Sequence, residues 1–172
     1  MLGSIVPSSR FLVDQVLAPI DWHCARVIVE YGPGVGTFTG EILRRMHPQA
    51  QLVAIETNRS FVRFLRRSLP DPRLHVAHAS AADVQKVLRQ LGFERANYII
   101  SGIPLGSMPD PVRADIAAAS RDTLEPGGEF LVYQFTSRVL PVLQRTFRHV
   151  RRSVERRNLP PAQLFVCGNN VA

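Results

Sequence analysis

The chain has 172 residues, which suits one folded unit around a single hydrophobic core. Hydrophobic residues make up 45% and charged residues 20%, which excludes a disordered chain, and no apolar run approaches the roughly 18 residues of a membrane-spanning helix. The formal charge of +7 is carried by arginine, with Lys86 as the only lysine, and favours a polyanionic partner, either nucleic acid or an acidic membrane surface.

Two other features bound the class of protein. Cys24 and Cys167 are too few and too isolated for a disulfide framework or a zinc site, so we expect reduced thiols and no metal. The first residues lack the basic start and long apolar run of a secretory signal. We therefore expect a cytoplasmic protein.

The chain begins with a segment that the sequence predicts to be helical. Pro7, Ser8 and Ser9 have the character of a helix start, the apolar residues of 11–18 continue it, and Pro19 ends it. No repeat, linker or low-complexity tract follows. We expect one domain over 1–172, with an N-terminal helical segment over 1–20 and a core over 26–172.

Residues 26–40 are the stretch on which the functional interpretation depends. Val27, Ile28 and Val29 form a β-branched run typical of a strand buried on both faces. Dense glycines then allow a tight turn and a close approach to a ligand, since they have no Cβ. Thr37 and Thr39 can cap the helix that continues through Met46.

The spacing of these glycines distinguishes two cofactors. A dinucleotide site requires G-x-G-x-x-G, but the sixth position is Thr37 counted from Gly32 and Thr39 counted from Gly34. An acid, Glu30, closes the strand and would repel a diphosphate, whereas it suits a ligand with an ammonium group and hydroxyls. The pattern resembles the first motif of Rossmann-like S-adenosylmethionine-dependent methyltransferases. It assigns cofactor binding to Glu30, Gly32, Gly34, Gly36, Thr37 and Phe38.

The next two strands supply further candidates for the cofactor site. Glu56 ends the strand predicted over 51–56, where a carboxylate can accept both ribose hydroxyls, and Thr57 follows it. The alternative for Glu56 is a charge at the N-terminus of the helix that Asn58 can cap. After the strand predicted over 74–77, Ser80 and Ala81 leave room for an adenine ring, although Ser80 suits a helix cap equally well.

The second half of the chain continues the alternation of strands and helices. We expect a strand over 96–100, a loop over 101–109 facing the reacting methyl group, and a helix to Leu124. A tight turn over 125–128 should lead into a strand over 130–135 and a helix over 139–147. The last expected element is a hairpin of 149–156 with 163–167. The order predicts a doubly wound, mostly parallel Rossmann-like α/β sheet, with helices on both faces. Seven strands are expected, the last one antiparallel.

Several motifs together resemble the bacterial phospholipid N-methyltransferase family. They are Pro7-Ser8-Ser9-Arg10-Phe11-Leu12, the segment 30–39, Ala54-Ile55-Glu56, Ser101-Gly102-Ile103-Pro104, Pro126-Gly127-Gly128, Gln134-Phe135-Thr136 and Asn158-Leu159-Pro160-Pro161-Ala162. The family carries an amphipathic helix before its Pro-Ser-Ser segment. Only six residues precede Pro7, so we expect that helix to be short, lost or missing from the chain. The family's third-strand end often carries an aspartate where Ser80 stands here.

The resemblance implies a function and a site. It implies that S-adenosyl-L-methionine donates a methyl group to the amine of phosphatidylethanolamine or another amino lipid, leaving S-adenosyl-L-homocysteine. Ser101 and Gly102 are expected to orient the amine, and Ser101 is also expected to contact the cofactor. Tyr133 can orient the amine or serve as a buried strand residue, and Asn158 can close over the head group or serve as a turn residue. The implied location is the inner face of the bacterial membrane. Lipid phosphates could meet arginines 138, 145, 148, 151, 152, 156 and 157, whose alternative role is a solvated face.

Two other functions compete with this interpretation. An adenine-N6 methyltransferase of ribosomal RNA has an Asn-Ile-Pro-Tyr loop whose amide holds the base amine and whose aromatic ring stacks on the base. Ser101 and Leu105 stand at those positions here, which argues against a nucleic acid substrate. The third possibility is a binder of the cofactor that has lost transfer activity. The sequence predicts neither a general base nor an oligomeric state.

Overall fold

A computed structural model describes residues 9–169 of the chain. It begins with helix α1 (Arg10–Leu17), which Ser9 caps by accepting a hydrogen bond from the Leu12 amide to its Oγ at 3.2 Å. The predicted helix is therefore confirmed from Ser9 onward. Pro7 and Ser8, the other residues of the predicted start, lie outside the described residues.

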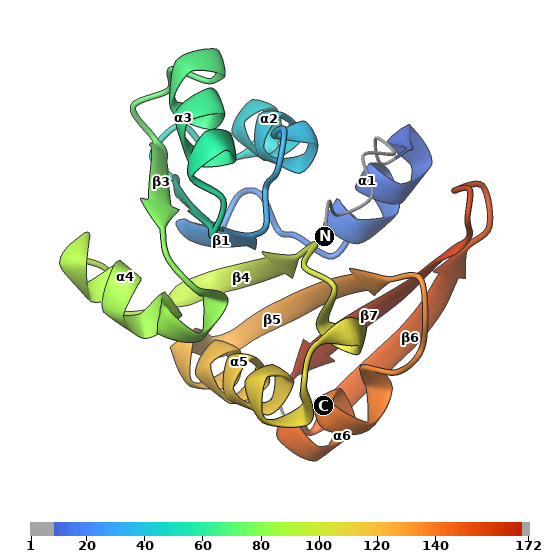
Figure 1. The fold of residues 1–172 in the computed structure, drawn as a ribbon. Coiled ribbons are helices and arrows are strands. Elements are labelled where there is room, and N and C mark those ends of the chain that lie inside the picture. Colours follow the sequence, from blue (N-terminus) through green and yellow to red (C-terminus); the bar gives the residue numbers. More distant parts are fainter. Residues whose placement is uncertain (1–8, 170–172) are drawn as a thin grey trace.

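Seven strands form one sheet (Figure 1). They are β1 (Val27–Tyr31), β2 (Gln51–Glu56), β3 (Leu74–His78), β4 (Ala96–Ser101), β5 (Leu124–Gln134), β6 (His149–Glu155) and β7 (Ala162–Gly168), in the spatial order β3-β2-β1-β4-β5-β7-β6. The first five pair in parallel, whereas β7 runs antiparallel to both β5 and β6. This is the predicted sheet, with its last strand antiparallel.

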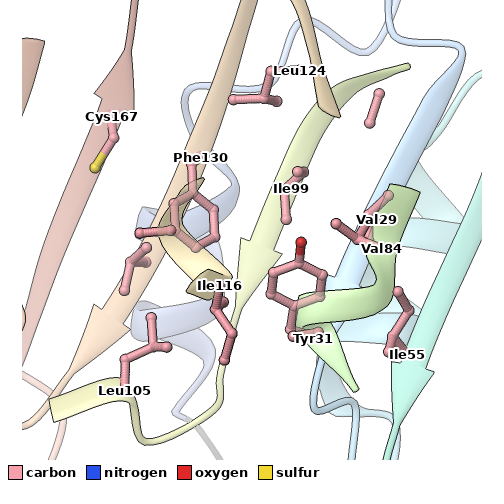
Figure 2. Packing of buried hydrophobic residues seen from close by; sticks show 14 of the residues in the cluster. Val29, Tyr31, Ile55, Val84, Ile99, Leu105, Ile116, Leu124, Phe130 and Cys167 are labelled. Carbon is pink, nitrogen blue, oxygen red and sulfur yellow. The ribbon is translucent and has the colours of Figure 1, made fainter. Parts of the chain in front are cut away.

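Helices cover both faces of the sheet, as predicted. The further helices are α2 (Thr37–Arg45), α3 (Arg59–Ser68), α4 (Val84–Gln90), α5 (Asp110–Thr123) and α6 (Leu140–Thr146), with short 3₁₀ turns η1 (Ala81–Asp83) and η2 (Leu105–Ser107). Helices α1 to α3 lie on one face and α4 to α6 on the other (Figure 1). Each face buries its own apolar cluster. Figure 2 shows the cluster beneath α4 to α6, where Tyr31 and Phe130 meet edge to face with ring centroids 6.1 Å apart.

One predicted boundary is wrong. The segment 125–128 was expected to be a tight turn before the fifth strand, but it lies inside β5, which begins at Leu124. The register against β4 shifts between Ala96 and Tyr98, so the strand bulges there, and Gly127 adopts φ +91°. A glycine in the left-handed region lets the strand absorb this irregularity without ending.

The strand order reverses direction between β1 and β4, and this reversal places the site. Parallel sheets bind ligands outside the carboxyl ends of their strands, at the point where the order switches. Two backbone hydrogen bonds fasten the chain as it leaves these ends: the Gly32 amide donates to the Ile55 carbonyl and the Gly102 amide to the Tyr31 carbonyl, both at 3.0 Å. The glycine loop after β1 and the loop after β4 therefore lie side by side.

Candidate active site

The glycine loop between β1 and α2 fits tightly among its neighbours. Gly32, Gly34 and Gly36 have φ values of +68°, +55° and +85°, a region that other residues rarely adopt. A Cβ on Gly32 would stand 2.6 Å from Ile103 Cγ2, and one on Gly36 would stand 2.8 Å from Leu65 Cδ2, whereas one on Gly34 would meet nothing within 4 Å. Gly32 thus lets the cofactor loop pack directly against the loop that follows β4.

Glu30 lies buried beneath this loop. Its carboxylate accepts a hydrogen bond from Thr39 Oγ1 at 2.7 Å. Burial raises the pKa of Glu30 to about 7, an effect that Thr39 opposes by its hydrogen bond and that the nearby Glu56 charge reinforces. A positively charged ligand would favour the ionised form of this carboxyl. Glu30 can therefore be protonated in the free protein and ionised when a cation is bound.

The predicted capping of α2 by threonine is wrong. Gly36 occupies the N-cap position with no side-chain hydrogen bond, and Thr37 is already the first helical residue. Thr39, the third helical residue, donates its hydroxyl hydrogen to the buried Glu30 carboxylate, a charge-assisted hydrogen bond. Thr37 borders a hollow of about 500 Å³ between α1 and α2, together with residues such as Arg10 and Glu41.

Glu56 organises the end of β2. One carboxylate oxygen accepts the Gly34 amide at 3.2 Å and the other accepts the Asn58 amide at 2.8 Å. Asn58 also caps α3, as predicted, by accepting the Ser60 amide at 2.8 Å. Each oxygen of Glu56 has a further lone pair, so two ribose hydroxyls can still donate to it. The residues present fit the sugar of an adenosyl cofactor.

The other expected cofactor residues lie at the ends of β2 and β3. Thr57 is exposed, and its carbonyl bonds the His78 ring at 2.9 Å. Ser80 caps η1 by accepting the Ala82 amide at 3.2 Å, which confirms the cap interpretation. Ala81 is buried beside it. An adenine contact at these residues stays a prediction.

Ser101 ends β4 at the switch point of the sheet. Its side chain is fully buried, and its Oγ has no hydrogen-bond partner within residues 9–169. Buried hydroxyl groups are normally paired, so an unpaired one calls for an explanation. A ligand that binds between β1 and β4 can supply the missing partner.

An aromatic pair joins α2 to β5 next to these two loops. Phe38 of α2 is buried and stacks on Tyr133 of β5, with ring centroids 5.0 Å apart and an interplanar angle of 16°. The same tyrosine covers Gly102, where an added Cβ would overlap its hydroxyl oxygen and stand 3.0 Å from Cζ. A Cβ at position 102 would therefore displace Tyr133, which packs between Phe38 and the loop after β4.

Gln134 is a residue of the site to which the sequence interpretation gave no role. It is buried, its Nε2 donates to the Ile103 carbonyl at 2.8 Å, and its Oε1 accepts the Gly106 amide at 3.1 Å. These bonds fix both ends of the turn that follows Ser101. The available signal was an amide residue directly after the apolar run 130–133.

The hydrogen bonds of Asn158 go to the start of α1 and to its own turn, and not to Ser101 or Gly102. Asn158 is buried, its Oδ1 accepts the Ser9 amide at 3.2 Å, and its Nδ2 donates to the Pro160 carbonyl at 2.8 Å. The amide thus joins the turn between β6 and β7 to the start of α1. Its expected contact with a lipid head group stays a prediction.

Two further findings concern the class of protein. Within the described residues, no group of three or more histidine, cysteine, aspartate or glutamate side chains is arranged to hold a metal ion. No helix in that part of the chain has both the length and the apolar character that crossing a membrane requires.

The fold is that of class I S-adenosylmethionine-dependent methyltransferases. A precorrin-6y C5,15-methyltransferase from Geobacter metallireducens superposes with a TM-score of 0.78 at 13% identity, over 99% of this chain and 94% of that one. Human methyltransferase-like protein 13, solved in complex with S-adenosylhomocysteine, superposes with a TM-score of 0.69 at 15% identity, over 93% and 80%. Identities this low establish the fold alone.

Sequence comparison identifies the family. Residues 3–159 match the methyltransferase small domain, and the chain belongs to this family. It is an S-adenosylmethionine-dependent methyltransferase. A curated relative, the ornithine lipid N-methyltransferase of Singulisphaera acidiphila, is 34% identical over 96% of this chain and 88% of its own. The ribosomal RNA small subunit methyltransferase A of Gloeobacter violaceus is 28% identical over 59% of this chain and 38% of its own.

Proposed function

We propose that the enzyme methylates the primary amine of an amino lipid, of the ornithine lipid or phosphatidylethanolamine type, and works as a single domain at the inner face of the membrane. The observation that carries the proposal is the unpaired, buried hydroxyl of Ser101 beside the glycine loop. The 34% identity to an ornithine lipid N-methyltransferase supports the acceptor class.

The cofactor half of the site has the groups that an adenosyl sulfonium compound needs. S-adenosylmethionine supplies an electrophilic methyl group on a positively charged sulfur. Glu30 and Glu56 would provide negative charge near this cation and acceptors for the ribose. The donor is already activated, so the protein's main contribution is alignment of the amine.

The acceptor half has groups that can orient an amine. The Ser101 hydroxyl can accept from the amine and so direct its lone pair towards the methyl group. Tyr133 and Phe38 form an apolar, aromatic wall beside Gly102, the residue after Ser101, and such a wall favours the neutral amine that attacks. A lipid whose head group enters at this edge would place its nitrogen next to Ser101.

The architecture of the loop after β4 disfavours an RNA base as acceptor. Leu105 is buried in the core beneath α5, so it offers no exposed aromatic face for stacking a flipped base. Ser101 has a hydroxyl where the RNA enzymes use an amide. The partial match to a ribosomal RNA methyltransferase covers 59% of the chain, and we attribute it to the shared cofactor half.

An acceptor screen tests the proposal. Labelled S-adenosylmethionine is incubated with the enzyme and detergent-dispersed ornithine lipid, phosphatidylethanolamine or ribosomal RNA. We expect label in at least one lipid and none in RNA. Label in RNA alone, or donor binding without transfer to any of these acceptors, would contradict the proposal.

A pair of serine variants tests the role of Ser101. Ser101→Ala removes a hydroxyl that has no described partner, so we expect an unfolding free energy unchanged or raised by up to about 1 kcal/mol, with methyl transfer lowered about tenfold. Ser120→Ala is the matched control, because the hydroxyl of this equally buried serine bonds the Ile116 carbonyl at 2.7 Å. It should lower stability and leave the specific activity of the folded enzyme unchanged. Full activity in Ser101→Ala would refute the role.

A further inference from the structure

We infer that the enzyme docks on an anionic lipid bilayer through the turn between β6 and β7 and the residues beside it. We call this the hairpin-tip surface and define it by Phe11, Phe135, Arg138, Arg156 and Leu159. The inference rests on the proposed lipid substrate and adds the surface through which the enzyme would reach it. Leu159 stands at the tip with 85% of its surface exposed, between Asn158 and Pro160.

The fold brings these residues to the edge of the sheet where the site lies. The register pairs Gln134 of β5 with Gln163 of β7, and Glu155 of β6 with Ala162 of β7. The turn 156–161 therefore projects from the sheet at the carboxyl end of β5, where Phe135 follows Gln134. Figure 1 shows this turn rising beside α1. The Ser9 amide, bonded to Asn158 Oδ1 at 3.2 Å, fixes the start of α1 and hence Phe11 to the same turn.

The apolar members of the surface are large and exposed. Phe11 and Phe135 are 47% and 46% exposed, and Pro160 and Pro161 beside Leu159 are exposed as well. Scattered apolar side chains are common on protein surfaces, but these come from three separate elements at one edge. The Arg157 guanidinium lies 4.3 Å from the centre of the Phe11 ring, and this contact holds α1 against the turn.

The charges of the surface favour an anionic partner. Arg157 bonds Glu155 at 2.9 Å and lowers the pKa of that carboxyl to about 2, so the pair is neutral overall. Arg138 and Arg156 are exposed and form no ion pair with any residue between 9 and 169. Arg138 also lies next to the site, since a Cβ on Gly106 would stand 3.4 Å from Arg138 Cβ. Unneutralised arginines can bond lipid phosphates at the mouth of the site.

The apolar and charged side chains of the hairpin-tip surface together favour a bilayer over RNA as the binding partner. Nucleic acid would need the positive charges and aromatic faces for stacking. Here the most exposed side chain is aliphatic and carried on a proline-rich turn, and the Arg157 guanidinium lies over one face of the Phe11 ring. An exposed aliphatic side chain on the same turn as Arg156 suits the boundary between head groups and acyl chains.

Vesicle co-sedimentation tests the inference without turnover. The vesicles are of phosphatidylcholine alone or mixed with phosphatidylglycerol. We expect Leu159→Ser to lower binding to the mixed vesicles about tenfold, and Arg156→Ala to lower it about fivefold. Leu91→Ser and Arg89→Ala are the matched controls, since they lie at the far end of α4, before β4 begins, and are exposed. They should bind as the parent does.

Several outcomes would overturn the inference. They are unchanged binding in both tip variants, equal losses in the α4 controls, and equal binding of the parent to both vesicle types. Loss of RNA retention by Arg156→Ala, with vesicle binding intact, would also overturn it in favour of RNA. Cooperative thermal unfolding of each variant verifies that it is folded. Because the measurement uses no amine acceptor, its failure is distinct from failure of methyl transfer to detergent-dispersed lipid.

Discussion

The two halves of the site are held together over very different distances along the chain. In the cofactor half, Thr39 bonds Glu30 across 9 residues and Gly34 bonds Glu56 across 22. In the proposed acceptor half, Gln134 bonds Gly106 across 28 residues, and at the turn between β6 and β7 Asn158 bonds Ser9 across 149. The first half is built from consecutive strand-to-helix turns, and the second is built from segments that only the complete sheet brings together. Substitutions can therefore affect the halves separately or at their common boundary.

The largest effect is expected where the two halves touch. Gly32→Ala would place a Cβ 2.6 Å from Ile103 Cγ2 at φ +68°, so it combines overlap with backbone strain. We expect the free energy of unfolding to fall by about 3 kcal/mol and cofactor binding to be lost. Denaturant unfolding and calorimetry with S-adenosylhomocysteine measure the two effects.

Gly34→Ala is the matched control for that variant. It has φ +55°, but an added Cβ meets nothing within 4 Å, so only the backbone strain remains, about 1 kcal/mol. If both variants lost equal stability, the contact between Gly32 and Ile103 would not be what joins the halves.

A second substitution should affect the acceptor half alone. Gln134→Leu leaves the Gly106 amide without its partner and the Ile103 carbonyl with only the Leu105 amide, so the turn after Ser101 loses its attachment to β5. We expect a fall of about tenfold or more in kcat/KM for the amine acceptor, with cofactor affinity unchanged. Initial rates at varied acceptor concentration measure kcat/KM, and calorimetry measures the cofactor affinity separately.

Gln163→Leu is the matched control for Gln134. It pairs with Gln134 in the sheet, and its buried Oε1 has no partner in the described part of the chain. Its loss should leave activity intact. A parallel loss of cofactor affinity in Gln134→Leu would show that the halves do not act separately.

The last substitution, Glu30→Gln, should change the cofactor half alone, and its effect should depend on pH. The folded-state pKa of Glu30 is about 7, above its ordinary value of 4.5, so the folded protein binds the proton more tightly than the unfolded chain. The stability of the free enzyme should therefore fall as the pH rises from about 4.5 to about 7, by up to about 3 kcal/mol, and stay level above. Glu30→Gln should remove this decline.

Cofactor affinity should show the opposite trend. Ionised Glu30 attracts a cation, so binding should tighten as the pH rises through about 7. In Glu30→Gln this part of the pH dependence should vanish, with affinity at pH 8 lower by about tenfold. Denaturant unfolding and calorimetry across this pH range measure both effects. A variant with the parent's pH profile would show that Glu30 does not titrate in this range.

The contrast between the halves also explains what the sequence could predict. Alternating apolar runs and glycine turns were enough to predict the sheet and to bring Glu30, Gly32 and Glu56 together, since these features are local. Gln134 was given no role because its partners are set by the pairing of β4 with β5. The segment 125–128 was misassigned because proline and glycine usually end a strand, whereas here Gly127 accommodates a bulge. The role of Thr39 was missed because a cap and a carboxylate partner have the same local sequence.

The position of β7 between β5 and β6 has a consequence for the order of biosynthesis. The outer edge of β5 pairs with residues 163–168, so while the chain is being made this edge stays open until those residues have been added. Strand β6, although made earlier, has no neighbour in the sheet until then. A nascent chain can thus form the turns after β1 and β2 first, and it completes the proposed acceptor half of the site only after β7 has been made.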